Sequence, residues 1–309
     1  MKYLLIAVTL FFFEKSIAQS DKNDSTKIVS DSSEKKESCF KVEATYLSNA
    51  TFNGRSDSAL TPYLSPTFGY YSKYGFHIES SLSYLSNSES RIDNYSFEAG
   101  YDADITDKLS ASISASKIFN NTNSTSILSG IGGTINCDLS YDLGFISISA
   151  GGEIAFSSRT DYAVNMELNK EFSFGEKNNK WVVAPTASAS ASTLHFYEDY
   201  TSKKVRIKTR KGNPLATVTT STTISNLNAN KLTLLNYDFA VPVSYNTNIW
   251  KFYFTPTFSI PQNQINTITT TVIYLKNKPP RTSYEDSTPD SELSLKSRFT
   301  AEVGITYKL

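Results

Sequence analysis

The last eleven residues of the chain, 299–309, alternate without a break between apolar side chains and polar or small ones. The apolar set falls at odd-numbered positions and the other set at even-numbered positions: Phe299, Ala301, Val303, Ile305, Tyr307 and Leu309 alternate with Thr300, Glu302, Gly304, Thr306 and Lys308. Successive side chains of a β-strand point to opposite faces. The pattern therefore predicts a strand that lies between an apolar and a polar environment.

This terminal strand, with an aromatic residue two positions before its end, resembles the closing strand of Gram-negative outer-membrane β-barrels. The family usually ends in Phe, whereas this chain ends in Leu309. The resemblance implies an all-β, antiparallel transmembrane barrel surrounded by outer-membrane lipids. It also implies that the barrel-assembly machinery recognises the C-terminal strand.

The N-terminal segment agrees with export. Lys2, an apolar run at 3–13 and the small-x-small sequence Ser16-Ile17-Ala18 predict a signal peptide over residues 1–18. Residues 19–38 are rich in Asp, Lys and Ser, which predicts a disordered periplasmic tail, and residues 39–309 are assigned to the barrel. No later run of apolar residues is long enough for a transmembrane helix, and the 30 basic and 30 acidic residues balance, so no nucleic-acid partner is indicated.

The barrel region predicts twelve antiparallel strands. The alternating segments lie at 39–48, 60–72, 75–86, 91–105, 108–119, 125–143, 145–157, 161–174, 180–196, 231–245, 249–261 and 293–309. A tilted strand needs about 9–11 residues to cross a bilayer. Ten or fourteen strands stay open because 197–230 and 262–292 contain strand-like runs such as 267–275. A soluble β-sandwich is the alternative architecture, since its strands alternate too.

The connections alternate between short and long. Short turns are predicted at 72–75, 106–108, 143–144, 175–179 and 246–248, and longer connections at 49–59, 120–124, 197–230 and 262–292, although 86–90 and 158–160 are short. Short periplasmic turns and long external loops characterise outer-membrane barrels, and an even strand number places both termini in the periplasm. Trp181 and Trp250 each open a strand after a short turn and are assigned to the periplasmic aromatic girdle; ordinary core tryptophans are the alternative.

Four prolines lie inside the expected strands, where the missing N–H removes a ladder hydrogen bond. They are Pro66, Pro185, Pro242 and Pro256. We expect a bulge or a local gap in hydrogen bonding at each.

Parity assigns an acid-rich set of side chains to the interior. The expected lumen-lining residues are Glu79, Glu98, Asp102, Asp138, Glu153, Glu167, Glu171, Asp238, Lys251, Arg298 and Glu302, with Lys41 as a further base. An open lumen of this kind favours cations, whereas mutual pairing of these groups would simply fill the interior. Gly130, Gly132 and Gly151 also point inward and leave room for a channel or for a folded-in loop.

One basic segment stands out. Six bases occur within 203–211, namely Lys203, Lys204, Arg206, Lys208, Arg210 and Lys211. Their alternation and the following Gly212-Asn213-Pro214 predict an external hairpin with a basic stripe. Such a stripe could hold lipopolysaccharide phosphates or an anionic polysaccharide, and a solvated loop is the alternative.

The sequence offers little for catalysis. His77 and His195 are the two histidines and Cys39 and Cys137 the two cysteines, so no metal-ligand spacing, cofactor or enzymatic role is predicted. His77 is expected to face the lumen beside Glu79, and His195 to be a surface histidine at the external end of a strand. The two cysteines are expected to be too far apart for a disulfide, with Cys137 facing lipid.

Three functions follow in order of preference. The first is a small passive pore for small polar solutes. The second is a closed structural or surface-interaction barrel that binds envelope polymers or partners through its external loops. The third, a lipid-acting enzyme with a catalytic His195, is the weakest because no catalytic motif surrounds that residue.

Overall fold

The computed structural model describes residues 37–52, 55–56, 60–87, 90–124, 129–176, 179–224, 229–287 and 296–309. The expected signal peptide and almost all of the expected periplasmic tail lie outside these residues. No helix in the described part of the chain combines the length and the apolar character that a bilayer span requires.

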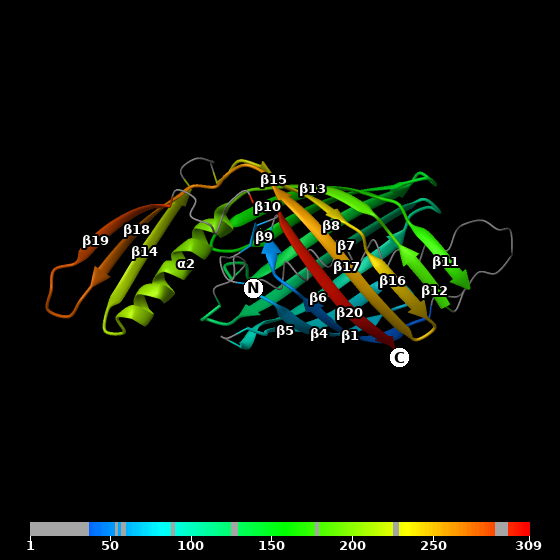
Figure 1. Cartoon of the computed structure of the whole chain (residues 1–309), viewed down its shortest axis with the longest axis horizontal. Helices are drawn as coiled ribbons and strands as arrows, with labels where there is room; N and C mark the ends of the chain where they lie inside the picture. The colour runs from blue at the N-terminus through cyan, green and yellow to red at the C-terminus, as the bar shows by residue number, and fades with distance from the viewer. Residues whose placement is uncertain are drawn as a thin grey trace.

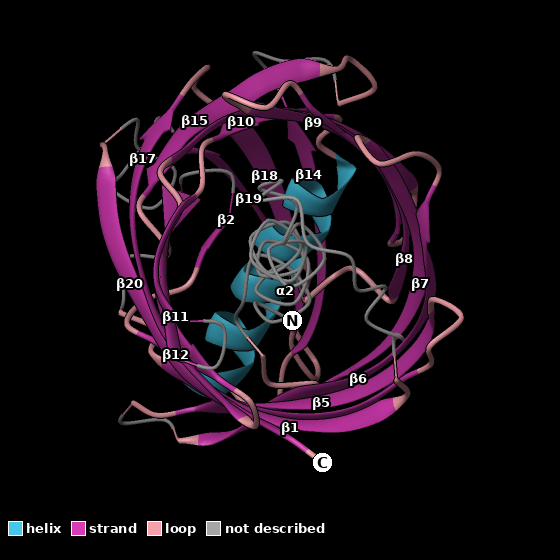
Figure 2. Cartoon of the chain, turned by 90° about the vertical axis from the view of Figure 1, so that its right-hand side faces the viewer, coloured by secondary structure: helices cyan, strands magenta, loops and turns pink. Residues whose placement is uncertain are grey.

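Twelve antiparallel strands of the described chain close into one barrel, as the sequence predicted. The wall closes because β20 pairs with β17 on one side and with β1 on the other. Figure 2 looks along the barrel and shows the ring of strands. In order, the wall contains β1 (Cys39–Leu47), β4 (Tyr63–Tyr71), β5 (Phe76–Leu85), β6 (Arg91–Asp104), β7 (Leu109–Asn120), β8 (Gly133–Asp142), β9 (Ser147–Phe156), β10 (Thr160–Asn169) continued by β11 (Phe172–Glu176), β12 (Asn179–Val183) continued by β13 (Thr186–Ser192), β15 (Thr233–Ala240) continued by β16 (Val243–Thr247), β17 (Trp250–Pro261) and β20 (Arg298–Lys308).

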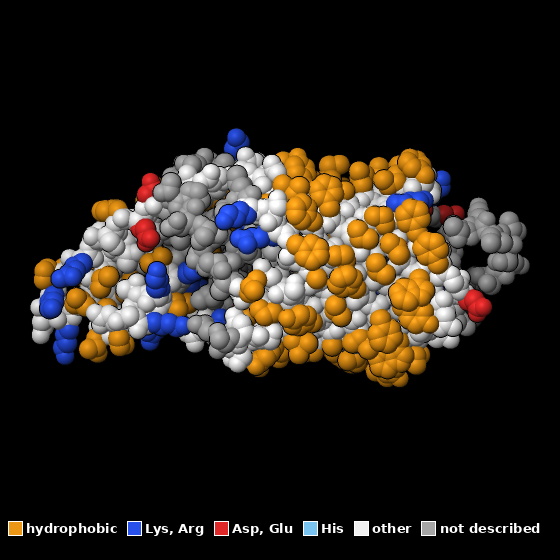
Figure 3. Space-filling model, viewed as in Figure 1, with side chains coloured by type: hydrophobic (Ala, Val, Ile, Leu, Met, Phe, Trp, Pro, Cys, Tyr) orange, Lys and Arg blue, Asp and Glu red, His pale blue; other side chains and the backbone are white. Residues whose placement is uncertain are grey.

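The outer face of the wall is apolar. Along β6, Tyr95, Phe97 and Tyr101 are exposed, whereas Ser96, Glu98 and Gly100 between them are buried. Figure 3 shows hydrophobic side chains covering the barrel portion of the molecule. A closed ring leaves no unpaired strand edge, and an apolar outer belt suits contact with hydrocarbon. The arrangement excludes the soluble sandwich, which would bury its apolar residues between two sheets.

Short turns join the strands at the end of the barrel where the C-terminus lies (Figure 1). Gly75 and Gly144 adopt φ angles of +93° and +88° in two of these turns, and Gly175 adopts +107° near the end of β11. A residue with a β-carbon is strained in that left-handed region, which explains glycine at these positions. The predicted short turns at 72–75, 106–108, 143–144 and 246–248 are therefore confirmed, whereas 177–178 of the fifth lie outside the described residues. Longer connections gather at the opposite end, which we call the mouth.

The strand prolines interrupt the ladder, as expected. Pro185 separates β12 from β13, and Pro242 separates β15 from β16. Pairing between β4 and β5 skips Pro66, and β17 loses its partner on the β15–β16 side around Pro256. The proline carbonyls still accept bonds across the wall: Lys170 N–H donates to Pro185 at 3.1 Å, Ala184 N–H to Pro242 at 2.9 Å and Val241 N–H to Pro256 at 3.1 Å.

A separate unit, which we call the head, extends beyond the mouth (Figure 1). It consists of helix α2 (His195–Gly212) and a sheet of β14 (Thr217–Ile224), β18 (Thr267–Tyr274) and β19 (Arg281–Ser287) in the order β14-β18-β19. The strand-like runs that left ten or fourteen strands open belong to this sheet and not to the barrel wall. A small hairpin of β2 (Thr51–Phe52) and β3 (Arg55–Ser56) lies between β1 and β4.

The helix corrects the predicted basic hairpin. The alternating bases Lys204, Arg206, Lys208 and Arg210 span too short a window to distinguish a strand from a helix. Lys and Arg are also good helix formers. No Gly or Pro interrupts 195–211, Glu198 occupies the first turn, and Arg210 and Lys211 occupy the last turn. Those charges complement the helix dipole, and Gly212 with Pro214 then ends the helix. The predicted strand 180–196 is correspondingly shorter and ends at Ser192.

Candidate functional site

The interior of the barrel carries the acidic side chains that parity assigned to it. Each lies on the wall face opposite the exposed apolar residues. Their places are Glu79 on β5, Glu98 and Asp102 on β6, Asp138 on β8, Glu153 on β9, Glu167 on β10, Glu171 between β10 and β11, Asp238 on β15, and Glu302 on β20; the bases Lys41, Lys251 and Arg298 lie on β1, β17 and β20. The interior is therefore rich in carboxylates and poor in cations.

Neighbouring strands bring several of these groups together near the short-turn end. Glu79 and Glu98 are direct Cα partners across β5 and β6, and the Tyr71 hydroxyl donates to Glu79 at 2.5 Å. His77 Nε2 lies 3.6 Å from Glu98 and its Nδ1 lies 3.3 Å from Asp102, so the histidine bridges two acids of β6.

Glu43 is an interior acid that the sequence reading missed. The hydroxyls of Thr306, Tyr253 and Thr45 lie 2.8, 3.0 and 3.0 Å from its carboxylate oxygens, and the Thr45 and Tyr253 hydroxyls are 2.7 Å apart. Glu43 shares its parity with Lys41, which was assigned inward, so the same rule could have found it.

A second set of acids lies along one register row. Glu167 faces Ser188, Ser188 faces Asp238, Asp238 faces Ser259, and Ser259 faces Arg298. The row therefore presents two carboxylates and one guanidinium toward the interior.

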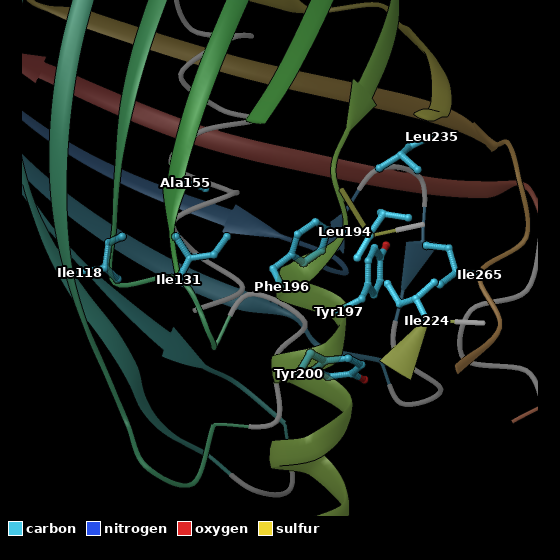
Figure 4. Packing of buried hydrophobic residues seen from close by; sticks show 11 residues of the cluster. Ile118, Ile131, Ala155, Leu194, Phe196, Tyr197, Tyr200, Ile224, Leu235 and Ile265 are labelled. Atoms are coloured by element: carbon cyan, nitrogen blue, oxygen red, sulfur yellow. The ribbon is translucent and has the colours of Figure 1, made fainter. Parts of the chain in front are cut away.

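A hydrophobic cluster, which we call the mouth cluster, lies at the mouth. Figure 4 shows Phe196 on the side of α2 facing Ile131 and Tyr197 facing Ile224 and Ile265. Its members come from the wall, from the connections and from the head: Ile118, Ile131, Ala155, Leu194, Phe196, Tyr197, Tyr200, Ile224, Ala229, Leu235 and Ile265. Burial of this much apolar surface fixes the start of α2 over the barrel end.

Arg55 ties the opposite side of the mouth to this cluster. Its guanidinium donates to the carbonyls of Leu235 at 3.1 Å and Asn263 at 2.7 Å, and also to that of Gln262. Burial raises the pKa of Tyr197, and the neighbouring Arg55 cation opposes that rise. The hairpin of β2 and β3 thus reaches the ends of β15 and β17. No local sequence pattern indicates this contact, because 180 residues separate Arg55 from Leu235.

His195 is buried and not a surface residue, which corrects the sequence expectation. It is the first residue of α2 and is 5% exposed. Nδ1 lies 3.0 Å from Asp161 Oδ1 and Nε2 lies 2.7 Å from Asn230 Oδ1. Both ring nitrogens therefore hold the helix start in place. Asp161, at the mouth end of β10, was not singled out from the sequence.

Further along, α2 is fixed to the barrel connections. Glu198 pairs with Arg159 and accepts from Ile224 N–H at 3.2 Å. Asp199 accepts from the Ser158 hydroxyl at 2.7 Å, and a β-carbon added at Gly130 would lie 2.9 Å from Asp199 Cβ. Gly130 and Gly132 precede β8 and lie in a connection at the mouth, not on the interior wall as the sequence predicted; the space left by Gly130 receives Asp199 of the helix. Gly151 is buried on the inner face of β9, as parity predicted.

The six predicted basic residues all lie on α2. Lys203 is nearest the barrel, and its Nζ donates to the Asn121 and Ser129 carbonyls at 3.4 and 3.5 Å. Burial lowers the pKa of Lys203. Lys204 lies beside Tyr200, with Nζ 3.3 Å from its hydroxyl. The others, Arg206, Lys208, Arg210 and Lys211, are exposed on the outer half of the helix.

The cysteines and tryptophans singled out in the sequence lie on the barrel wall. Cys39 and Cys137 are both free, and Cys137 is exposed on the outer face of β8. Trp181 and Trp250 are exposed near the short-turn end, beside Tyr245 and Tyr307 at ring distances of 5.0 and 4.5 Å. Among the described residues, no group of three or more His, Cys, Asp or Glu side chains is arranged to hold a metal ion.

Comparison with known proteins adds a likeness of fold. Neither a protein-family model nor a curated protein matches the sequence. Among solved structures, the chain is similar to the KdgM porin, with 9% identity and a TM-score of 0.42 over 87% of this chain and 99% of the porin. It is also similar to the NanC porin, with 8% identity and a TM-score of 0.44 over 87% of this chain and 100% of the porin. A third similar structure is LpxR from Salmonella typhimurium, with 8% identity and a TM-score of 0.41 over 86% of this chain and 99% of LpxR. The fold is that of an outer-membrane β-barrel.

Proposed function

We propose that this chain is a non-enzymatic outer-membrane barrel that is closed at its mouth and that presents the head outside the cell. The observation that carries the proposal is the mouth cluster, which joins the wall strands β7 to β15 through the start of α2. Arg55 completes the closure from the side of β1 and β4. A dry, packed constriction opposes the passage of ions and polar solutes, because these would lose their hydration there.

The arrangement of the connections supports the outward orientation of the head. The short turns and the exposed Trp181 and Trp250 lie at the end opposite the head (Figure 1). Short turns face the periplasm in outer-membrane barrels, and aromatic residues gather at the lipid–water boundary. We therefore place both ends of the barrel segment, Cys39 and Leu309, on the periplasmic side.

Conductance across planar bilayers tests the closure. The wild-type barrel should give no steady unitary steps, whereas Arg55→Met should open the mouth by removing hydrogen bonds from a charged donor, each worth about 1.5–3 kcal/mol. Phe196→Ser should do the same by disturbing the cluster. Arg281→Met is the matched control, because Arg281 is exposed in the head. Steady wild-type steps that neither mouth variant changes would refute the closed barrel.

A passive pore is the second candidate, and the acid-rich interior favours it. Glu43, Glu79 and Glu98 lie on β1, β5 and β6, within four neighbouring strands, and would attract cations into an open lumen. If the wild type does conduct, this candidate requires a reversal potential that favours cations and that shifts toward zero in Glu79→Gln/Glu98→Gln. Conductance without selectivity would exclude a role for these carboxylates.

We also propose that His195 is not catalytic. Its two nitrogens are engaged with Asp161 and Asn230 within the covered mouth, which leaves neither directed at a substrate. Release of fatty acid from labelled phospholipid by the wild type, lost in His195→Ala, would overturn this part of the proposal.

A further inference from the structure

Two segments that are distant in sequence meet at the far end of the head. Helix α2 ends at Gly212, and β14 begins beside it at Thr217. Thr217 pairs with Tyr274 at the end of β18, and Ile273 pairs with Arg281 at the start of β19. The turn after α2 and the turn between β18 and β19 therefore lie at the same end, away from the barrel (Figure 1).

Both segments bring only positive charge to this end. Residues 206–217 and 272–284 contain no Asp or Glu. Their bases form what we call the basic tip: Arg206, Lys208, Arg210, Lys211, Lys276, Lys278 and Arg281, all exposed. Figure 3 shows Lys and Arg side chains at this end of the molecule. Glu285 and Asp286 pair with Thr269 and Ile268, closer to the barrel. The concentration of one sign of charge predicts an anionic partner.

The position of the tip argues against the lipids that surround the barrel. An 18-residue helix extends about 25 Å along its axis. The headgroup layer adds only about 5–8 Å on each side of the hydrocarbon core. The apolar belt is confined to the barrel (Figure 3), so the tip projects beyond the headgroups. Charges separated by much more than the Debye length of about 8 Å are screened at physiological salt.

The surface next to the tip is suited to sugars. The sheet face that points away from α2 carries two exposed tyrosines, Tyr274 and Tyr284, at 47% and 77% exposure. Paired hydroxyl side chains lie around them on the same face: Thr217, Thr219, Ser221, Thr270 and Thr282. Aromatic rings offer flat apolar surface with a polar edge, and hydroxyls both donate and accept hydrogen bonds.

We propose that the basic tip and this sheet face bind an acidic polysaccharide outside the membrane. The bases would contact its carboxylate or sulfate groups, and the tyrosines and hydroxyl side chains would contact its sugar rings. The inference deepens the proposed function and rests on it only in requiring that the head face outward.

Binding to the full-length barrel in detergent micelles tests the proposal. Alginate serves as the carboxylate polymer and dextran as its neutral counterpart. Two variants each remove three bases, R206Q/K208Q/R210Q from the helix and K276Q/K278Q/R281Q from the turn. Each should weaken alginate binding at least tenfold, because the proposal requires both segments. K73Q/K108Q/K308Q removes the same charge from exposed positions at the opposite end and should change binding less than twofold.

The remaining comparisons identify the kind of partner. Y274A/Y284A should weaken alginate binding at least threefold and leave its salt dependence unchanged. The proposal would be overturned if the wild type bound dextran as tightly as alginate. It would also be overturned if all three charge variants bound alginate with the same affinity. Tighter binding of double-stranded DNA than of alginate would indicate a nucleic-acid partner, and binding only to phosphatidylglycerol vesicles would indicate lipid; either result also overturns it. Conductance is measured separately from binding. A barrel that shows no conductance and binds no glycan would therefore refute the binding proposal and leave the proposed closure of the mouth intact.

Discussion

Asp161 caps a helix that begins 34 residues later in the chain, and His195 is the helix residue that it holds most closely. Oδ1 of Asp161 accepts from His195 N–H at 2.8 Å and lies 3.0 Å from Nδ1 of the same residue, while Oδ2 accepts from Phe196 N–H at 2.8 Å. The Thr193 hydroxyl donates to Oδ1 at 2.7 Å. The carboxylate thereby satisfies free N–H groups of the first turn, which Leu194, the preceding residue, cannot cap.

Asp161→Asn should loosen the head without unfolding the barrel. An amide has one acceptor oxygen and no charge, so the cap should lose about 1–3 kcal/mol. Trypsin cleavage within 203–211 should accelerate by about tenfold if cleavage follows local opening of the helix. The measurement is the rate of disappearance of the intact chain on a denaturing gel.

Asp107→Asn provides the control for this change, since Asp107 is exposed in the turn between β6 and β7. Its cleavage rate should equal that of the wild type. An unchanged rate in Asp161→Asn would show that the mouth cluster alone holds the helix.

Gly304→Ala should destabilise the barrel wall. A β-carbon at Gly304 would lie 2.1 Å from Cζ of Tyr253, which is the direct partner of Gly304 on β17. The ring must then move and weaken its hydroxyl contacts with Thr45 and Glu43. Such overpacking costs about 1–3 kcal/mol. Urea unfolding in detergent micelles, followed by tryptophan fluorescence, would measure the loss.

Two further variants separate overpacking from a general intolerance of substitution. Gly212→Ala places its new β-carbon where no atom beyond its own helix and its chain neighbours lies within 4 Å, and should leave the free energy of unfolding within about 0.5 kcal/mol of the wild type. The double variant Gly304→Ala/Tyr253→Ala has no clash. Its loss in free energy of unfolding should therefore be smaller than the sum of the losses in the two single variants. Additive losses would contradict the proposed contact.

The wall was predictable from sequence because strand alternation reports directly on the two sides of a membrane barrel. The terminal strand at 299–309 and the interior positions of Glu98 and Glu153 follow from period two alone. The gaps at Pro185 and Pro242 follow from a missing N–H. None of these inferences requires knowledge of which distant residues meet.

The mouth was not predictable, because its contacts join residues that are distant in the sequence. Asp161 caps α2 through contacts across 34 residues, and Arg55 reaches Leu235 across 180. Neither contact leaves a local pattern. The predicted hairpin at 203–211 was wrong because Val205 and Ile207 alternate with the bases, and over a short window this pattern fits a strand as well as a helix. The good helix formers and acidic first turn at 195–211 were the available signals.

Trp181 and Trp250 should report the lipid–water boundary at the short-turn end. Both rings are exposed, at 51% and 38%. Trp250→Phe and Trp181→Phe each leave a single tryptophan. In bilayers, brominated lipids should quench the fluorescence of that tryptophan. Bromines near the ester groups should quench at least twice as strongly as bromines deep in the chains, because tryptophan favours the interface. Stronger quenching by the deep bromines would remove both residues from the girdle.

A spin label on Cys137 should be exposed to hydrocarbon. Cys137 lies in the middle of the ten-residue strand β8, with Ile113 and Gly152 as its partners on either side. It is exposed on the apolar face, while Cys39 is buried and is replaced by Ser for this experiment. In a bilayer, the label should collide with dissolved oxygen several times more often than with a water-soluble nickel chelate. A label at Asp107→Cys, in a chain without other cysteines, should show the opposite preference, since that turn lies in water. If both labels met the nickel chelate equally, the outer belt would face solvent and the barrel would not span a membrane.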